Sequence, residues 1–235
     1  MKKIIFLLAI TCITADMDGQ QAPIMVCDPS GINCAPYYNL DAAINAANPN
    51  DYIYIPGGGW TISVGITKPL KIIGAGFHPD SSQVTGATMI SGNMYFDNNT
   101  QGTELSGFFL TGNIGTISWS NDTLRNFLIS KVNINQIIPS SAVYTGQWTR
   151  MQNCILRHSV VRTFFYGSNP ASSGNLIENS ILTGFYAIDN SVIRNCIITG
   201  WNTESYGLLN STTIKNSIFF FLDSMTVVTS FQTGY

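Results

Sequence analysis

The side chains best suited to proton transfer lie close together in the stretch that contains Arg157, His158 and Arg162. An arginine or a histidine beside an acidic substrate can neutralise its carboxylate or accept a proton from it. A complete site would add several carboxylates that hold a cation, or a further base. Residues 150–165 contain no acidic side chain, so the three basic residues are candidate catalytic groups that lack half of the required set. The alternative is a solvated basic loop.

Aromatic side chains provide a second candidate site. Phe185 and Trp201 each follow a glycine at equivalent places, and Tyr186 and Tyr206 lie nearby. Flat aromatic faces on an outer wall suit the apolar faces of sugar rings, so these four residues are candidate ligand-binding residues. Stacking of aromatic rings that only stabilises loops would give the same pattern.

A short repeat must position these groups. The strings LIENSILTGF (176–185) and VIRNCIITGW (192–201) are nearly identical, TIKNSIFFFL begins at Thr213, and the looser copies RMQNCILRHS and TLRNFLISKV begin at Arg150 and Thr123. Apolar residues alternate within each copy, and isoleucine and valine dominate, which predicts short strands. Stacked copies would form parallel sheets around a narrow apolar interior, so the fold class is all-β, a β-solenoid.

Each copy carries an asparagine at one fixed place, and these are Asn126, Asn153, Asn179, Asn195 and Asn216. We expect this structural ladder at a tight bend, because asparagine tolerates the left-handed conformation and its amide can bond to the next coil. The residues just before are Arg125, Gln152, Glu178, Arg194 and Lys215. Neighbouring coils would place Glu178 beside Arg194 in a solvent-facing charge ladder.

The N-terminal part has the pattern of an exported chain. Residues 1–20 begin MKKIIFLLAITCITA, which predicts a signal peptide cleaved between Ala15 and Gln20. In the following segment, 21–38, we expect Cys27 and Cys34 to form a small disulfide loop. The chain has no CxxC pair and only two isolated histidines, so no metal site is predicted.

Cys154 and Cys196 fall at the same position of the repeat, with Ser180 in the coil between them. Their separation would then be about 9 to 10 Å at the usual strand spacing, which is too far for a disulfide. We therefore expect two buried free thiols in a column with Ser180 and Ser217.

Residues 39–235 are predicted to form one β domain that begins with a helix. Asn39 has the character of an N-cap, Leu40, Ala43 and Ile44 share one face, and Pro49 ends the helix. An amphipathic helix ahead of a solenoid would cover the open end of its apolar interior.

The run LDAAINAANPNDYIYIPGGGWTISVGITKPLKIIGAG resembles the start of proteins of the pectin-lyase-like superfamily. Its continuation, GFHPDSSQVTGATMISGNMYF, is similar to exported surface proteins of that superfamily from bacteria with the type IX secretion system. The resemblance implies a right-handed parallel β-helix with a short N-terminal capping helix. Such proteins often end in a sorting domain, whereas this chain ends SFQTGY, so either it is truncated or it is exported by another route.

Composition narrows the classes of function. The formal net charge is −2, and 10% of the residues are charged. The basic residues are scattered along the sequence, so it does not predict the clustered basic surface that binds nucleic acid. After removal of the signal peptide, no membrane span is expected, and the localisation is secreted or cell surface. The oligomeric state does not follow from the sequence.

Two functions remain. The first is a non-catalytic, adhesin-like module without a cofactor, which presents a rigid wall to an extracellular polysaccharide or a surface protein. The second is a polysaccharide lyase or glycoside hydrolase that acts in the groove of the fold. Enzymes that the chain resembles use either Ca²⁺ with an arginine or lysine base, or two to three carboxylates for hydrolysis, so Ca²⁺ is an expected cofactor if the lyase alternative holds.

Overall fold

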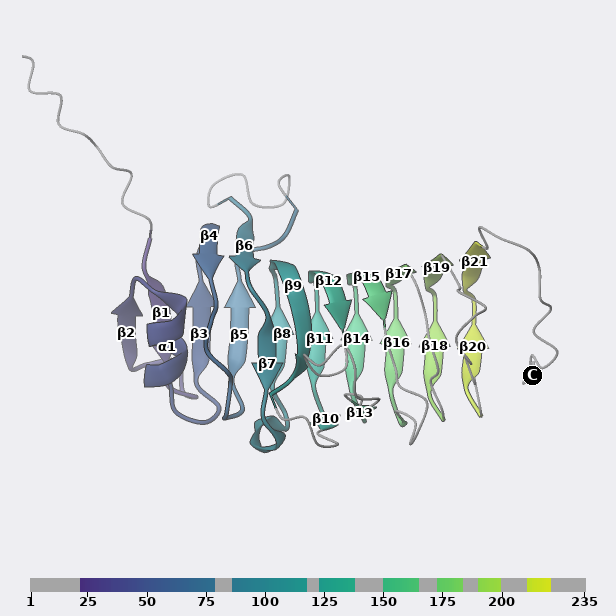
Figure 1. The fold of residues 1–235 in the computed structure, drawn as a ribbon, viewed down its shortest axis with the longest axis horizontal. Coiled ribbons are helices and arrows are strands. Elements are labelled where there is room, and N and C mark those ends of the chain that lie inside the picture. Colours follow the sequence, from purple (N-terminus) through teal and green to yellow (C-terminus); the bar gives the residue numbers. More distant parts are fainter. Residues whose placement is uncertain are drawn as a thin grey trace, which may run out of the picture.

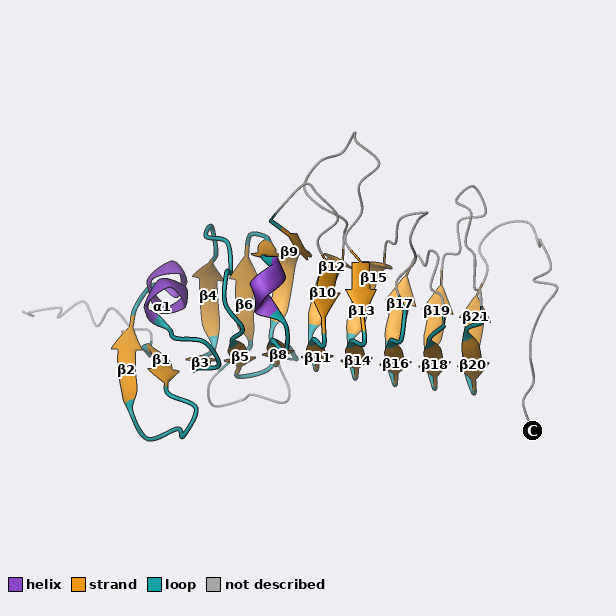
Figure 2. Ribbon diagram, turned by 90° about the horizontal axis from the view of Figure 1, so that it is seen from below, coloured by secondary structure: helices purple, strands orange, loops and turns teal. Residues whose placement is uncertain are grey.

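The computed structural model describes residues 22–78, 86–117, 123–137, 150–164, 173–183, 190–199 and 211–220. These residues are mostly β-strand, and most of the strands pair in parallel in long sheets, which confirms the predicted all-β class. Figure 1 shows the strands standing side by side in one row from β2 to β21, and Figure 2 shows that two sheets form separate layers of this row.

Three sheets account for the described strands. Sheet A contains, in spatial order, β2 (Cys34–Tyr37), β1 (Ile24–Cys27), β3 (Tyr52–Ile55), β5 (Lys71–Gly74), β8 (Glu104–Ser106), β11 (Leu128–Ser130), β14 (Ile155–Arg157), β16 (Leu176–Glu178), β18 (Val192–Arg194) and β20 (Thr213–Lys215). Sheet B contains β21 (Ile218–Phe220), β19 (Ile197–Thr199), β17 (Ile181–Thr183), β15 (Val160–Phe164), β12 (Asn133–Ile137), β9 (Phe109–Thr116), β6 (Thr88–Ser91) and β4 (Gly58–Thr61), and β7 (Met94–Phe96) pairs with β9. Sheet C contains β10 (Thr123–Arg125) and β13 (Arg150–Gln152).

The apolar core lies between sheets A and B. In both sheets, an inward-facing residue of one strand is aligned with its equivalent in the next strand. In sheet A this row is Ile53, Ile72, Leu105, Ile129, Leu156, Ile177 and Ile193, and in sheet B it is Trp60, Ile90, Leu110, Ile134, Val161, Leu182 and Ile198. Burying each such side chain stabilises the fold by about 1.5–3 kcal/mol. The alternation of apolar residues in the repeat thus encodes two facing rows.

Helix α1 (Leu40–Ala46) lies beside β1, β2 and β4. Asn39 is its N-cap and accepts a hydrogen bond from the backbone N–H of Ala42 at 2.9 Å. Leu40, Ala43 and Ile44 are buried in the core. The one short 3₁₀ helix of the described residues, η2 (Asn98–Thr100), lies between β7 and β8.

Polar contacts fix both ends of α1 to the segment between β4 and β5. Asp41 in its first turn accepts hydrogen bonds from the backbone N–H of Ser63 at 2.9 Å and from the Ser63 hydroxyl. Near its C-terminus, the ammonium of Lys68 donates to the carbonyls of Asn45, at 2.9 Å, and Ala47. The Lys68 contacts supply partners for backbone carbonyls that a helix end otherwise leaves unpaired.

From β8 onward, two corners shape each passage of the chain through sheets A and B, and both use a left-handed residue. The first corner leads into sheet A, and the second leads from sheet A to sheet B. The left-handed residues of the first corner are Gly102, Asn126, Asn153, Gly174, Asn190 and Ser211; those of the second are Gly107, Lys131, His158, Asn179, Asn195 and Asn216. Each second-corner residue follows its first-corner residue by five positions. Backbone hydrogen bonds between equivalent corners join successive circuits.

The register corrects the predicted asparagine ladder. Asn126 and Asn153 belong to the first corner, whereas Asn179, Asn195 and Asn216 belong to the second. Since Arg157 pairs with Glu178, the neighbour of Asn179 is His158 and not Asn153. The two corners look alike in the sequence because each needs a left-handed residue followed by an inward one, and asparagine serves both.

The asparagine side chains of the second corner lie on the surface of the protein. Asn179 and Asn195 are exposed, and the Nδ2 atom of Asn195 donates to Oδ1 of Asn179 at 3.3 Å. Nδ2 of Asn179 lies 3.4 Å from Nε2 of His158. The left-handed backbone of these residues, with φ of 49° at Asn179 and 53° at Asn195, is therefore the main reason for asparagine here.

The two free cysteines do not share a repeat position, contrary to the sequence interpretation. Cys154 follows Asn153 in the first corner, and Cys196 follows Asn195 in the second. Both thiols are buried and unpaired with another cysteine. Cys196 does share a column with Ser180, as expected, because the backbone N–H of Ile197 donates to the Ser180 carbonyl at 3.0 Å.

Serine hydroxyls stabilise the inward column of the second corner. The hydroxyls of Ser159, Ser180 and Ser217 each donate at 2.8–2.9 Å to the carbonyl two residues earlier. The Ser180 hydroxyl also accepts from the backbone N–H of Ser159 at 3.3 Å, and the Ser217 hydroxyl accepts from that of Cys196 at 3.2 Å. The thiol of Cys196 lies 3.2 Å from the Arg194 carbonyl, in the same arrangement.

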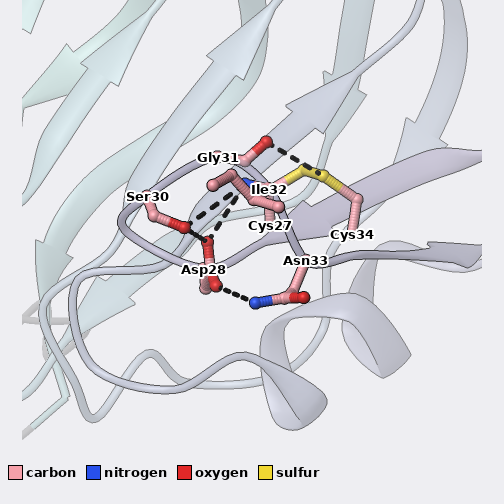
Figure 3. Close-up of a disulfide and its surroundings, with 7 residues drawn as sticks. All are labelled: Cys27, Asp28, Ser30, Gly31, Ile32, Asn33 and Cys34. Atoms are coloured by element: carbon pink, nitrogen blue, oxygen red, sulfur yellow. Dashed lines mark hydrogen bonds between the residues drawn. A yellow bond between two sulfur atoms is a disulfide. The ribbon is translucent and has the colours of Figure 1, made fainter.

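An antiparallel hairpin lies at the edge of sheet A that contains the N-terminal strands. β1 pairs antiparallel with β3, and β2 pairs antiparallel with β1. A disulfide joins Cys27 and Cys34 across this hairpin, as Figure 3 shows. In the loop between them, the Asp28 carboxylate accepts from the Ser30 hydroxyl and the Asn33 amide, both at 2.5 Å. The hydrogen bond from Ser30, followed by that from Asn33, lowers the pKa of Asp28 to about 2.

The left-handed second corner can be tested at Asn179. Alanine must adopt the same φ of 49° without asparagine's tolerance for it, so we expect Asn179→Ala to lower the free energy of unfolding. The expected loss is about 1 kcal/mol. Asn179→Gly adopts this backbone freely and should lose clearly less. Urea unfolding followed by circular dichroism measures both. Equal losses would show that the amide contacts dominate.

The serine column can be tested with a matched pair of variants. Ser180→Ala removes the acceptor of the buried Ser159 N–H, and an unsatisfied buried donor costs about 1–3 kcal/mol. Cys196→Ser keeps a donor toward Arg194, so we expect its stability to stay within about 0.5 kcal/mol of the wild type. Thermal or urea unfolding distinguishes the two. A Cys196→Ser variant as unstable as Ser180→Ala would contradict this role of the hydroxyls.

Candidate functional site

The structure distributes the three basic candidates over two sheets. Arg157 ends β14 and lies on the outer face of sheet A, because its neighbour Leu156 is the inward residue. Arg162 is exposed on the outer face of sheet B, next to the buried Val161. His158 lies at the corner between the sheets. The three side chains therefore do not face a common point on one sheet.

A row of charges crosses the outer face of sheet A where Arg157 lies. It consists of Arg157, Glu178, Arg194 and Lys215, which are aligned from strand to strand. Nη2 of Arg194 lies 2.6 Å from Oε2 of Glu178, and Nε of Arg194 donates to the same oxygen at 2.8 Å. The predicted neighbourhood of Glu178 and Arg194 is thus confirmed. Glu178 is therefore the anionic partner of Arg194 in an ion pair.

An apolar row accompanies the charges on the same face. Its members are Leu128, Ile155, Leu176 and Val192, one residue from each of four neighbouring strands. Ile155 and Val192 are 36% and 37% exposed. This part of sheet A therefore offers a flat surface with aliphatic and cationic side chains in parallel rows.

The aromatic candidates Phe185, Tyr186, Trp201 and Tyr206 lie outside the described residues. So does the predicted signal peptide, residues 1–20.

A different aromatic cluster, which the sequence interpretation missed, lies on the outer face of sheet A. Tyr52 and Tyr54 flank the inward Ile53 on β3, so both point outward. Lys71 of β5 is aligned with Tyr52, and Glu104 of β8 is aligned with Lys71. The alternation in the string YIYI was the available signal, but only the strand pairing reveals the charged neighbours.

The side chains of this cluster contact one another. The rings of Tyr52 and Tyr54 are stacked, with centroids 5.7 Å apart and planes 4° from parallel. Nζ of Lys71 donates to the Tyr52 hydroxyl at 3.2 Å, lies 4.8 Å from the centre of the Tyr52 ring, and lies 3.3 Å from Oε1 of Glu104. The hydrogen bond to Tyr52 raises the pKa of Lys71 above its ordinary value. Tyr54 remains 41% exposed.

An apolar row runs beside the polar one. Tyr54 is aligned with Met25 of β1 on one side and with Ile73 of β5 on the other, and both are half-buried. Together, Met25, Tyr52, Tyr54, Ile73, Lys71 and Glu104 form a surface that we call the tyrosine platform. It combines exposed aromatic and apolar faces with hydrogen-bonding groups.

The buried thiols offer no nucleophile. Burial raises the pKa of Cys154 to about 11 and also raises the pKa of Cys196. A thiol attacks as its thiolate, so neither cysteine is activated at neutral pH. Among the residues that the structure describes, no group of three or more His, Cys, Asp or Glu side chains is arranged to hold a metal ion. The described part also has no helix with the length and apolar character needed to cross a membrane.

Comparisons with known proteins do not assign a family. No protein-family model matches the chain, and neither curated proteins nor solved structures gave a match. The site must therefore be interpreted from its own geometry.

The state of the four described cysteines gives a direct check of which thiols are buried and which are bonded. We expect iodoacetamide at pH 8 to leave Cys154 and Cys196 unmodified in the folded chain, because both are buried and burial raises both pKa values. In urea both should react, whereas Cys27 and Cys34 should react only after reduction. Peptide mass spectrometry distinguishes the four residues. A cross-link between Cys154 and Cys196, or rapid labelling without urea, would contradict the burial of these two free thiols.

Proposed function

We propose that the chain is an exported, right-handed parallel β-helix of the pectin-lyase-like type that acts as a non-catalytic surface module for glycan binding. Residues 1–20 would direct its export, and α1 would cap the end of the stack. The tyrosine platform is the observation that carries the glycan proposal, because it is an exposed aromatic surface with adjoining hydrogen-bonding groups.

The register supports the proposed architecture. From β3 and β4 onward, each strand of sheet A is followed along the chain by a strand of sheet B, with β7, β10 and β13 as additional strands, and equivalent strands of neighbouring circuits pair in parallel. Successive circuits therefore stack in one direction. Stacked parallel strands make a long and rigid outer wall, which suits a binding module that displays ligand contacts at fixed spacing.

The placement of the basic residues favours binding over cleavage. A lyase needs a group that neutralises the substrate carboxylate and a base near the abstracted proton, both within reach of one sugar. Arg157 and Arg162 lie on different sheets, and the nearest aligned carboxylate, Glu178, pairs with Arg194. A polysaccharide lyase or hydrolase is the alternative function, and Ca²⁺ would be the expected cation of the lyase.

Activity and binding assays on one preparation separate these functions. We expect the purified chain to be retarded in affinity gels that contain polysaccharide, and to release no unsaturated products from pectate or alginate and no reducing ends from neutral glycans, with or without Ca²⁺. Ultraviolet absorbance and a reducing-sugar assay measure the products. Cleavage that Arg157→Ala or His158→Ala abolishes would establish the enzyme alternative. Absence of both binding and cleavage across the panel would remove the glycan proposal.

A further inference from the structure

We propose that the tyrosine platform is a binding site for a neutral pyranose oligosaccharide, which deepens and rests on the proposed glycan-binding function. The platform spans β1, β3, β5 and β8 on the outer face of sheet A. It lies at the end of the row where α1 packs, away from the basic charge row on β14 to β20, as Figure 1 shows for the strands.

The apolar row of the platform, which consists of Met25, Tyr54 and Ile73, supplies the contact for the faces of sugar rings. Tyr54 is 41% exposed and is flanked in register by Met25 and Ile73. Neighbouring strands lie about 4.8 Å apart, so this row extends roughly 10 Å across three strands. The apolar C–H face of a pyranose can pack on a tyrosine ring, and the row is long enough to continue this contact to an adjoining unit.

The polar row supplies partners for sugar hydroxyls. Tyr52, Lys71 and Glu104 lie on successive strands, two residues along each strand from the apolar row and on the same face. Their mutual contacts at 3.2 and 3.3 Å hold the hydroxyl, the ammonium and the carboxylate in fixed relative positions. A phenol both donates and accepts, an ammonium donates and a carboxylate accepts, so together they match the mixed hydrogen-bonding demand of vicinal hydroxyls.

Charge selects a neutral ligand over an acidic one. Lys71 is the cation of the platform and Glu104 is its anion, so the pair has no net charge and gives the platform no net attraction for a uronate. The distant row of Arg157, Glu178, Arg194 and Lys215 has the opposite character, with three cations and one anion. An acidic polymer would therefore be attracted to that row and not to the platform.

Isothermal titration calorimetry with defined oligosaccharides tests the site. The probes are cellohexaose, xylohexaose, mannohexaose and hexagalacturonate, each titrated into the purified chain. We expect at least one neutral hexasaccharide to bind and Tyr54→Ala to weaken it by about tenfold or more, as for other aromatic anchors. Tyr54→Phe, which keeps the ring, should bind within about threefold of the wild type.

Further variants separate binding from folding. Glu104→Gln keeps the size of the side chain but removes its charge, so it should weaken the neutral ligand and allow some affinity for hexagalacturonate. Met89→Ala is the matched control, because Met89 is 48% exposed on β6 of the opposite sheet. Thermal melts of all variants check that each is folded at the temperature of titration.

The possible results separate failure of the proposed binding site from failure of the proposed glycan-binding function. Neutral binding that Tyr54→Ala abolishes and Met89→Ala preserves supports the proposal. Neutral binding that is unchanged in Tyr54→Ala overturns the site and leaves the glycan-binding function standing. Binding of hexagalacturonate alone overturns the neutral specificity. If the wild type binds none of the four, and is not retarded in the polysaccharide gels either, both the site and the proposed function fail.

Discussion

The backbone hydrogen bonds between equivalent corners are the constraint on which the other features depend. Each corner needs a residue with positive φ, and its N–H donates to a carbonyl of the neighbouring circuit, as at Asn126, Asn153 and Asn195. This contact sets the register of the strands on either side. The inward rows of isoleucine and leucine, and the outward rows of charges and aromatic rings, then follow from the alternation of side chains along each strand.

The repeat motif predicted the strands but not their full register. Alternation of apolar residues correctly placed Ile177 and Ile193 in one inward row, and with them the pair of Glu178 and Arg194. The copies at Asn126 and Asn153 were matched to the wrong corner, because the local requirement is the same at both corners. Only the long-range pairing of Arg157 with Glu178 resolves the difference. Lys131 and His158 occupy left-handed positions without the expected asparagine, so the second corner was hidden in those circuits.

The tyrosine platform could not be predicted from the sequence for the same reason, which is that it depends on long-range strand pairing. Tyr52, Lys71 and Glu104 are separated by 19 and 33 positions in the sequence, and no local motif links them. They become neighbours because their strands are adjacent in sheet A. Conversely, Arg157 and Arg162 are near in sequence but lie on different sheets, since a corner falls between them. In a fold of stacked strands, proximity across circuits indicates a site better than proximity along the chain does.

The unequal spacing of the corners has a consequence for engineering. Equivalent first-corner residues are 16 positions apart from Gly174 to Asn190 and 27 apart from Asn126 to Asn153, yet the five-residue step from first to second corner is constant. Length variation is thus confined to the stretch between each second corner and the next first corner, in which the strands of sheet B range from eight residues in β9 to three in β17. Foreign peptides are therefore best inserted in that stretch, and insertions in several circuits would follow the strand repeat of about 4.8 Å per circuit.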